Sequence, residues 1–397
     1  MTLAMPSPMA ERQMAVKPLR VAIICPVVVQ HDAISAAAYD TYQALVADRR
    51  FEPIVLTCKS DFPEIRAQIV HGAADLLTNS AYLQADVLLY HFGVYNEVFD
   101  TLLLGNGRAR RVVYFHNITP LEFVPPTHRS VIRQSFQQLW NLKHADEIWP
   151  VSPVNERELL DRGFDPSRLH AAPLAVETPS LSYLEQKALS PVDILFVGRI
   201  VRAKGVLDLL QGLGQVHRQF ASAIRVRIVG NVSFSDRAYV DAVRAAIATA
   251  GFPVEFLGTV DDERLHQLYR SSHVLAIPSY HEGFCKPVVE ALRAGCIPVG
   301  YSAHNLPNVA GGLGRLVATG DIAALGEALA QVVDGVAQAL ASPERECLVL
   351  DRGEMSARGF DREAKRHVEV FSFDKFAETA RHRIVALSGN GVGHPHG

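Results

Sequence analysis

The sequence has no apolar run long enough to cross a membrane and no marked excess of charge of one sign. A membrane-spanning helix needs about 20 mostly apolar residues, and a net charge of −3 over 397 residues gives no basis for nucleic-acid binding. The five cysteines include no C-x-x-C pair, so neither a zinc site nor a disulfide framework is predicted. Scattered, unpaired cysteines are typical of the reducing cytosol. We therefore expect a cytoplasmic protein without a metal site.

Several nucleotide-binding and nucleophile motifs are also missing. The loop after the first expected strand lacks G-x-G-x-x-G, which argues against an NAD enzyme. No G-x-x-x-x-G-K-[ST] phosphate loop and no G-x-S-x-G nucleophile turn occurs. No cofactor is therefore predicted.

The chain instead alternates short apolar runs with longer amphipathic stretches, and it does so twice. With 397 residues, 48% of them hydrophobic, two domains are expected. Strands that are apolar along their length and alternate with helices predict parallel sheets covered on both faces. The fold class is therefore α/β, with two Rossmann-like lobes facing across a cleft. We expect a tail at 1–17, a first lobe at 18–180, a second lobe at 181–370, a closing helix at 371–388 that returns to the first lobe, and a tail at 389–397.

The expected elements follow the apolar pattern. The strands are expected at Arg20–Cys25, Glu52–Thr57, Asp86–Tyr90, Arg111–Phe115, Glu147–Pro150, Asp193–Val197, Arg225–Val229, Val254–Leu257, Val274–Ile277 and Ile297–Gly300. The helices are expected at Ala36–Asp48, Arg129–Lys143, Val206–Phe220, Arg237–Ala250, Asp262–Ser271, Val288–Ala294 and Asp374–Ala386, and residues 341–382 are expected to be mostly helical.

A segment near residue 285 joins two carboxylates to a predicted strand, turn and helix. The apolar run Val274–Ser279 precedes Glu282, and the apolar stretch Val288–Ala294 follows it. Pro287 suits the first helical position, because its missing N–H would be unpaired there. We therefore expect Glu282 in the loop and Glu290 in the first helical turn, where free N–H groups attract phosphate. A helix-capping glutamate and a solvated surface glutamate would explain the spacing alone, but the loop's position at a strand's end favours a ligand site.

Two cations follow the first predicted strand of the second half. Arg199 supplies a planar guanidinium with several N–H donors, and Lys204 supplies a compact ammonium charge. This combination suits a diphosphate. Two exposed charges on a loop are the alternative. Because both are expected to be exposed, we predict that removing them would leave the stability of the fold nearly unchanged.

Polar side chains also end strands of the first half. His116 and Asn117 follow one predicted strand, and His91 follows another. His31 and Asp32 lie in the loop after the first strand. A histidine behind a buried strand is often only structural, but the carboxyl ends of parallel strands favour a cleft.

These residues resemble the retaining, nucleotide-sugar-dependent glycosyltransferases of family 4, which have the GT-B fold. The resemblance is carried by FVGRIVRAKG, by IPSYHEGFCKPVVEALRAGCIPVG and by the spacing between them, and it extends from about Arg20 to Arg383. The stretches YFHNITP and PVVVQHDAIS also resemble a bacterial branch that builds lipopolysaccharide and exopolysaccharide chains, often with mannosyl- or glucosyltransferases.

The resemblance implies a role for each matching position. His116 and Glu282 would be catalytic at the donor sugar, and His31, Asp32 and Asn117 are candidates for the acceptor side. The donor-binding residues would be the diphosphate ligands Arg199 and Lys204, the segment Gly283, Phe284, Cys285 and Lys286 near the sugar and phosphates, and the ribose ligand Glu290. The departing phosphate would accept the acceptor's proton on the same face of the sugar, so neither a metal nor a protein nucleophile is implied.

This chain departs from the family pattern in two places. The first loop has His31-Asp32-Ala33 where the family often has two glycines, which leaves the acceptor-side geometry open. Cys285-Lys286 stands where a small residue usually follows Gly-Phe, which would add a cation near the phosphates.

The resemblance implies transfer of a hexose, mannose or glucose, to a saccharide or a lipid-linked saccharide. Such an acceptor would bring the protein to the inner face of the cytoplasmic membrane. Anionic lipid would then meet basic side chains of the first lobe, if these share one face: Arg108, Arg110, Arg111, Arg129 and Arg133. A glycoside hydrolase also needs two carboxylates but has no use for the cations. A GT-B sugar-nucleotide epimerase and a non-catalytic two-lobed sugar-binding protein are the alternatives.

Overall fold

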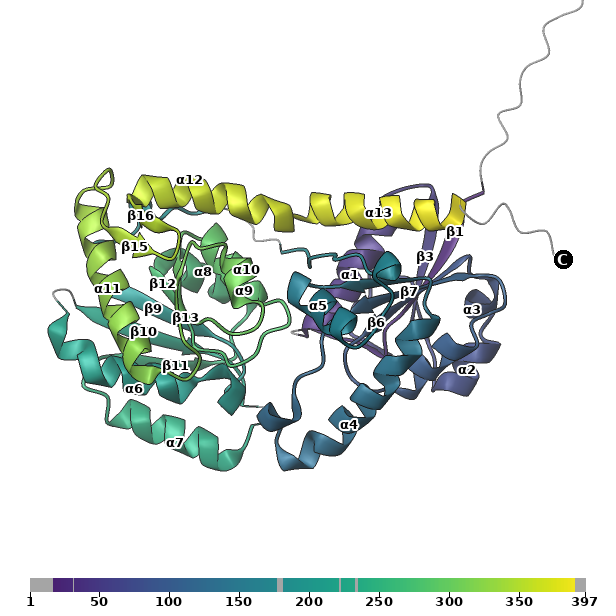
Figure 1. The fold of residues 1–397 in the computed structure, drawn as a ribbon, viewed down its shortest axis with the longest axis horizontal. Coiled ribbons are helices and arrows are strands. Elements are labelled where there is room, and N and C mark those ends of the chain that lie inside the picture. The colour runs from purple at the N-terminus through teal and green to yellow at the C-terminus, as the bar shows by residue number, and fades with distance from the viewer. Residues whose placement is uncertain (1–16, 31, 177–180, 221–222, 233–234, 390–397) are drawn as a thin grey trace, which may run out of the picture.

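The computed structural model describes residues 17–30, 32–176, 181–220, 223–232 and 235–389. The acceptor-side candidate His31 and the lobe boundary expected at residue 180 lie outside these ranges. The described residues form two lobes side by side, and the last two long helices lie along one edge of both (Figure 1). Each lobe is built on a six-stranded sheet.

The sheet of the first lobe has the strand order β5-β3-β1-β6-β7-β8, and all its paired strands are parallel. Numbered within the sheet, this is the doubly wound order 3-2-1-4-5-6. The strands are β1 (Leu19–Ile24), β3 (Phe51–Thr57), β5 (Ala67–Ile69), β6 (Val87–Phe92), β7 (Arg110–Phe115) and β8 (Glu147–Pro150). The helices are α1 (Ala33–Val46), α2 (Ala73–Thr78), α3 (Ser80–Gln84), α4 (Arg129–Gln138) and α5 (Pro153–Asp161).

The sheet of the second lobe repeats this topology in the order β11-β10-β9-β12-β13-β14, again parallel throughout. The strands are β9 (Val192–Val197), β10 (Ile224–Val229), β11 (Val254–Gly258), β12 (Val274–Ile277), β13 (Ile297–Tyr301) and β14 (Arg315–Val317). The helices are α6 (Val206–Val216), α7 (Arg237–Ala248), α8 (Asp262–Ser271), α9 (Lys286–Arg293), α10 (Leu306–Ala310) and α11 (Ile322–Ala341).

The last two helices tie the lobes together. Helix α12 (Ala357–Val368) packs against α9 of the second lobe, and α13 (Phe373–Gly389) packs against α1 of the first. Asp361 of α12 accepts hydrogen bonds from the backbone N–H groups of Leu184 and Glu185, near the expected start of the second lobe. Arg381 of α13 donates to the carbonyl of Ala44. The chain therefore returns to the first lobe, as the sequence predicted.

The apolar pattern located the central strands to within two residues, because those strands are buried on both faces. All six residues of β6 are buried, for example. The three-residue edge strands β5 and β14 were missed, since they are too short and too exposed to show a pattern. The expectation of a mostly helical segment at 341–382 was partly wrong. It contains the antiparallel hairpin of β15 (Leu348–Leu350) and β16 (Gly353–Met355), and a further short pair joins β2 (Val27–Val28) to β4 (Lys59–Ser60).

Candidate functional site

The predicted cations and the first glutamate lie on two loops at the point where the strand order of the second sheet reverses. Strands β9 and β12 are neighbours there, and ligands of open α/β sheets bind beyond the carboxyl ends of such strands. The loops touch at Gly205, whose φ is +64°. A Cβ at this position would lie 2.1 Å from the carbonyl oxygen of Pro278, so only glycine permits this approach.

The two cations have different environments. The Lys204 Nζ lies 2.5 Å from the Glu282 Oε1, and Glu282 is only 8% exposed. Arg199 is exposed, and its guanidinium makes no hydrogen bond or ion pair with the part of the chain that the structure describes. The expectation of two exposed charges is therefore correct for Arg199 and wrong for Lys204, because the second loop brings a nearly buried carboxylate against the lysine.

The loop that carries Glu282 is fixed through its backbone. The Nδ1–H of His304 donates to the carbonyl oxygen of Glu282 over 2.6 Å, and the side-chain amide of Asn305 donates to the carbonyl of Phe284 over 3.1 Å. The ring of Phe284 packs edge-on against Phe371, away from solvent. Of Phe284, only the backbone is therefore available to a ligand.

Helix α9 begins one residue earlier than predicted. Cys285 adopts a left-handed conformation with φ +79° and is the N-cap, so Lys286 is the first helical residue and Pro287 the second. Glu290 was expected in the first helical turn, but it lies just beyond that turn because the helix begins earlier. Burial raises the pKa of the Cys285 thiol well above its usual value, so the side chain stays a neutral thiol.

Glu290 is held by a tyrosine that the sequence analysis did not single out. The hydroxyl of Tyr269 donates to the Glu290 Oε2 over 2.8 Å. Burial raises the pKa of Glu290, and the Tyr269 hydrogen bond opposes that shift by stabilising the carboxylate. No sequence signal marks Tyr269, because its position in the amphipathic helix α8 is equally typical of a core residue.

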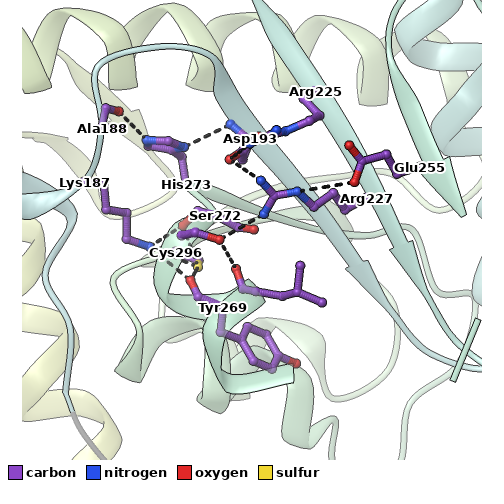
Figure 2. Close-up of polar contacts among 12 residues, drawn as sticks. Lys187, Ala188, Asp193, Arg225, Arg227, Glu255, Tyr269, Ser272, His273 and Cys296 are labelled. Carbon is purple, nitrogen blue, oxygen red and sulfur yellow. Dashed lines mark hydrogen bonds and ion pairs between the residues drawn. The ribbon is translucent and has the colours of Figure 1, made fainter. Parts of the chain in front are cut away.

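A polar cluster at the amino ends of the second sheet holds the helix that carries Tyr269 (Figure 2). The Lys187 Nζ and the Cys296 thiol both donate to the carbonyl oxygen of Tyr269, at 3.4 and 3.1 Å. His273 Nδ1 accepts a hydrogen bond from the backbone N–H of Asp193 over 2.9 Å. The cluster lies opposite the loop edge, so it supports α8 rather than contacting a ligand there.

His116 and a second histidine form a pair at the ends of β7 and β6. The His116 Nε2 lies 3.0 Å from the Nδ1 of His91. Burial, with the charge of Lys286 as a smaller contribution, lowers the pKa of His116 to about 3. His116 is therefore neutral at physiological pH.

Asn117 bridges the two lobes. It has a φ of +79°, and its Nδ2 donates to the Oδ1 of Asn155 over 2.7 Å. Its Oδ1 therefore faces His281 of the second lobe, whose Nε2–H donates over 3.1 Å. Asp32 caps α1 by accepting hydrogen bonds from the backbone N–H and the hydroxyl of Ser35. The side chains of Asn117 and Asp32 thus already have structural partners, and their acceptor-side role stays a prediction.

The lobes meet directly beside Glu282. A Cβ on Gly283 would lie 2.9 Å from the Asn117 Cβ and 3.1 Å from the His116 carbonyl oxygen, so glycine allows this contact. Phe123 of the first lobe stacks on the ring of His281, with centroids 6.2 Å apart. The predicted extra cation faces across the same boundary, because the Lys286 Nζ lies 3.9 Å from a carboxylate oxygen of Asp40 in α1.

Two further tyrosines help to fix the loop that carries Glu282. The sequence analysis did not weigh them as site residues. The hydroxyls of Tyr280 and Tyr301 both donate to the Asp208 Oδ2, at 2.6 and 2.7 Å. Asp208 lies in the first turn of α6, directly after the Lys204 loop. The carboxylate therefore holds the two loops in a fixed relation.

The five arginines proposed for membrane contact do not form one face. Arg108 and Arg110 make ion pairs with Asp86 and Asp146 at the start of β7. Arg129 begins α4, which follows the loops at the opposite end of that strand. The sequence could not show this separation, because the residues are close only along the chain.

Over the described residues, no three histidine, cysteine, aspartate or glutamate side chains lie together in a way that would hold a metal ion. In the same part of the chain, no helix combines the length and apolar character needed to cross a membrane.

His281, at the contact between the lobes, should make the stability of the fold sensitive to acid. Burial, then the neighbouring His304, lowers the pKa of His281 from 6.5 to about 4. The unfolded chain binds this proton below pH 6.5 and the folded chain does not until about pH 4, so stability falls as the pH falls through that window. At pH 5 the loss amounts to up to about 2 kcal/mol. The variant His281→Gln keeps an N–H donor and should lose less melting temperature between pH 7.5 and pH 5 than the wild type; equal losses would contradict this assignment.

The comparisons with known proteins show similarity to glycosyltransferases. Residues 191–334 match the family model described as "Glycosyl transferases group 1", and this range contains both site loops and Glu290. The chain is 32% identical over 188 residues to a D-inositol 3-phosphate glycosyltransferase from Rhodococcus opacus, covering 47% of this chain and 39% of that protein. It is 33% identical over 229 residues to an O-antigen chain mannosyltransferase B from Escherichia coli, covering 54% and 59%. It is 29% identical over 243 residues to an MMP alpha-(1->4)-mannosyltransferase from Mycolicibacterium hassiacum, covering 59% and 53%. The chain thus spans about two fifths to three fifths of these relatives.

Solved structures match almost the whole chain. A sucrose-phosphate synthase from Thermosynechococcus elongatus superposes with a TM-score of 0.70 at 16% identity, covering 94% of this chain and all of that one. Anabaena HepE in complex with UDP-glucose superposes with a TM-score of 0.65 at 14% identity, covering 92% and 99%. At such identities the likeness concerns the fold alone, and that fold is the predicted GT-B arrangement.

Proposed function

We propose that this chain is a retaining glycosyltransferase of family 4 that moves a hexose from a nucleoside diphosphate sugar to a saccharide or lipid-linked saccharide. The observation that carries the proposal is the cation pair at the strand reversal of the second lobe. Arg199 and Lys204 lie on one loop, and the Lys204 ammonium contacts Glu282 of the facing loop. A diphosphate is the ligand that a free guanidinium and an ammonium at this edge bind best.

The charges of the site suggest how the bond to the sugar breaks. As the sugar leaves, negative charge grows on the nucleoside diphosphate, and positioned cations stabilise it. Lys204 would exchange its contact with Glu282 for the diphosphate, and the Glu282 oxygens would then accept hydrogen bonds from sugar hydroxyls. Glu290, held by Tyr269, would accept hydrogen bonds from the two ribose hydroxyls.

The proposed donors are nucleotide sugars of mannose or glucose, in the synthesis of a bacterial surface polysaccharide. The mannosyltransferases among the relatives and the O-antigen relative support this choice. A GT-B sugar-nucleotide epimerase would use the same fold and donor, and a two-lobed binding protein would use neither cation in catalysis.

A panel of donors tests the function. The protein should release nucleoside diphosphate from one nucleotide sugar out of UDP-glucose, UDP-galactose and GDP-mannose, faster with an acceptor, and should do so in EDTA because Arg199 and Lys204 replace a divalent ion. The sugar should keep its anomeric configuration. An epimerised product without an acceptor would favour the epimerase, and no turnover of any donor would favour the binding protein. Loss of activity in EDTA, restored by Mg²⁺ or Mn²⁺, would refute metal independence.

A peripheral membrane contact of the first lobe is part of this proposal, with residues other than the five arginines. Trp140 follows α4 and is 47% exposed, and the Lys143 ammonium lies 4.7 Å from its ring centroid. Tryptophan beside lysine is typical of membrane surfaces. We expect co-sedimentation with vesicles containing anionic lipid, weakened by Trp140→Ala. Absence of binding at low salt would favour a soluble acceptor.

A further inference from the structure

The family resemblance implies a place for His116 at the donor sugar but gives no role to the histidine behind it. His91 is 1% exposed, near the end of β6, and its Nδ1 lies 3.0 Å from the His116 Nε2. The two ring centroids are 5.2 Å apart and the ring planes only 19° apart, so with the 3.0 Å contact the rings lie edge to edge, as an in-plane hydrogen bond requires. The remaining His91 nitrogen, Nε2, is buried and has no hydrogen-bond partner among the described residues.

Both rings are neutral, so each carries a single N–H. Burial lowers the pKa of His91 well below its usual value, with the neighbouring His116 as the second cause. The charged and titratable groups that act on the pair also oppose a second proton, because Lys286 disfavours it on His116 and His116 disfavours it on His91. The 3.0 Å contact therefore holds one proton, which belongs to one of the two rings.

The two assignments of that proton differ at the buried nitrogen. If His116 donates, His91 must carry its own proton on Nε2, which would be a buried N–H without an acceptor. If His91 donates from Nδ1, the buried Nε2 carries no proton and is only a hydrogen-bond acceptor that is not used. Buried N–H groups without a partner are rarer in proteins than acceptors that are not fully used.

We propose that His91 is a positioning residue that donates its Nδ1–H to the His116 Nε2 and thereby fixes the proton of His116 on Nδ1. This inference rests on the proposed function for its consequence. With Nε2 occupied, Nδ1 is the only His116 ring nitrogen left for a ligand, and it presents an N–H donor. His116 then donates a hydrogen bond to a hydroxyl oxygen of the donor sugar and does not act as a base.

The matched variants His91→Asn and His91→Leu separate positioning from simple packing. Asparagine places an amide N–H close to where the His91 Nδ1–H stood, and leucine removes the donor. We expect His91→Leu to lower kcat on the order of 10-fold or more, because a histidine in the wrong tautomer loses its function. His91→Asn should keep most of the rate. Binding of the nucleoside diphosphate should be unchanged in both.

A direct reading of the tautomer completes the test. In protein labelled with ¹⁵N-histidine, the His116 signals, assigned by their loss in His116→Gln, should show a protonated Nδ1 and a bare Nε2. A proton on Nε2 of His116 would overturn the proposal, and so would equal rates for His91→Leu and His91→Asn. If His91→Leu does not fold, the spectrum of the wild type still decides. If the wild type turns over no nucleotide sugar, the proposed function fails. The spectrum still reports the tautomer of His116 independently of that result.

Discussion

Replacing Arg199 by alanine should lower the rate of sugar transfer by roughly 10²-fold or more and leave the melting temperature nearly unchanged. The Arg199 side chain is exposed and has no partner among the described residues. Its removal should therefore change the free energy of unfolding by less than about 0.5 kcal/mol. In the transition state, the same guanidinium would face a diphosphate whose negative charge is growing. Turnover of the preferred donor, measured together with thermal unfolding, provides the check.

The same loop offers a matched control. Arg202 is also exposed, and its guanidinium lies 3.7 Å from Asp236 of the α7 N-cap. Arg202→Ala should keep the wild-type rate. If Arg199→Ala keeps it too, or if both variants lose it equally, Arg199 does not bind the diphosphate.

Lys204 requires a different comparison, because its removal changes more than the ligand contact. Lys204→Ala would leave the nearly buried Glu282 carboxylate without its cation. Loss of one partner of a buried pair destabilises a fold by about 3–5 kcal/mol, and this partly exposed pair should lose less. Lys204→Arg keeps the charge and is the better variant for measuring turnover.

Replacing Glu290 by glutamine should weaken nucleoside diphosphate binding by about 10- to 100-fold. A carboxylate can accept hydrogen bonds from both ribose hydroxyls, and a hydrogen bond to a charged group contributes about 1.5–3 kcal/mol. Glutamine has nearly the same shape, and its oxygen can still accept the hydrogen bond from Tyr269. The fold should therefore be unchanged, and isothermal titration with the preferred nucleotide measures the effect.

Tyr269→Phe is the control for Glu290. It removes the hydroxyl that orients Glu290 but leaves the carboxylate, so affinity should fall by less than in Glu290→Gln. Unchanged affinity in Glu290→Gln would mean that this glutamate only accepts the tyrosine hydrogen bond.

The sequence predicted the sheets well because their central strands are buried on both faces. Val274–Ile277 and Glu147–Pro150 have the predicted bounds. The short hairpin of β15 and β16 has no such pattern, and the segment was expected to be mostly helical.

The candidate site was predictable only where neighbours along the chain define it. The loops with Arg199 and Glu282 follow strands, so topology alone places them at one edge. The ion pair of Lys204, the Tyr269 contact to Glu290 and the Asn117 bridge join residues at least 21 positions apart. Such contacts depend on packing between elements, which a single sequence does not specify.

Titration of the wild-type protein with UDP, GDP and ADP in EDTA tests the central claim most directly. The account predicts that at least one of them binds with one site per chain, without a divalent ion, and that the same nucleotide binds more weakly to Arg199→Ala and to Glu290→Gln. Absence of binding by all three nucleotides, or binding that neither variant weakens, would contradict it.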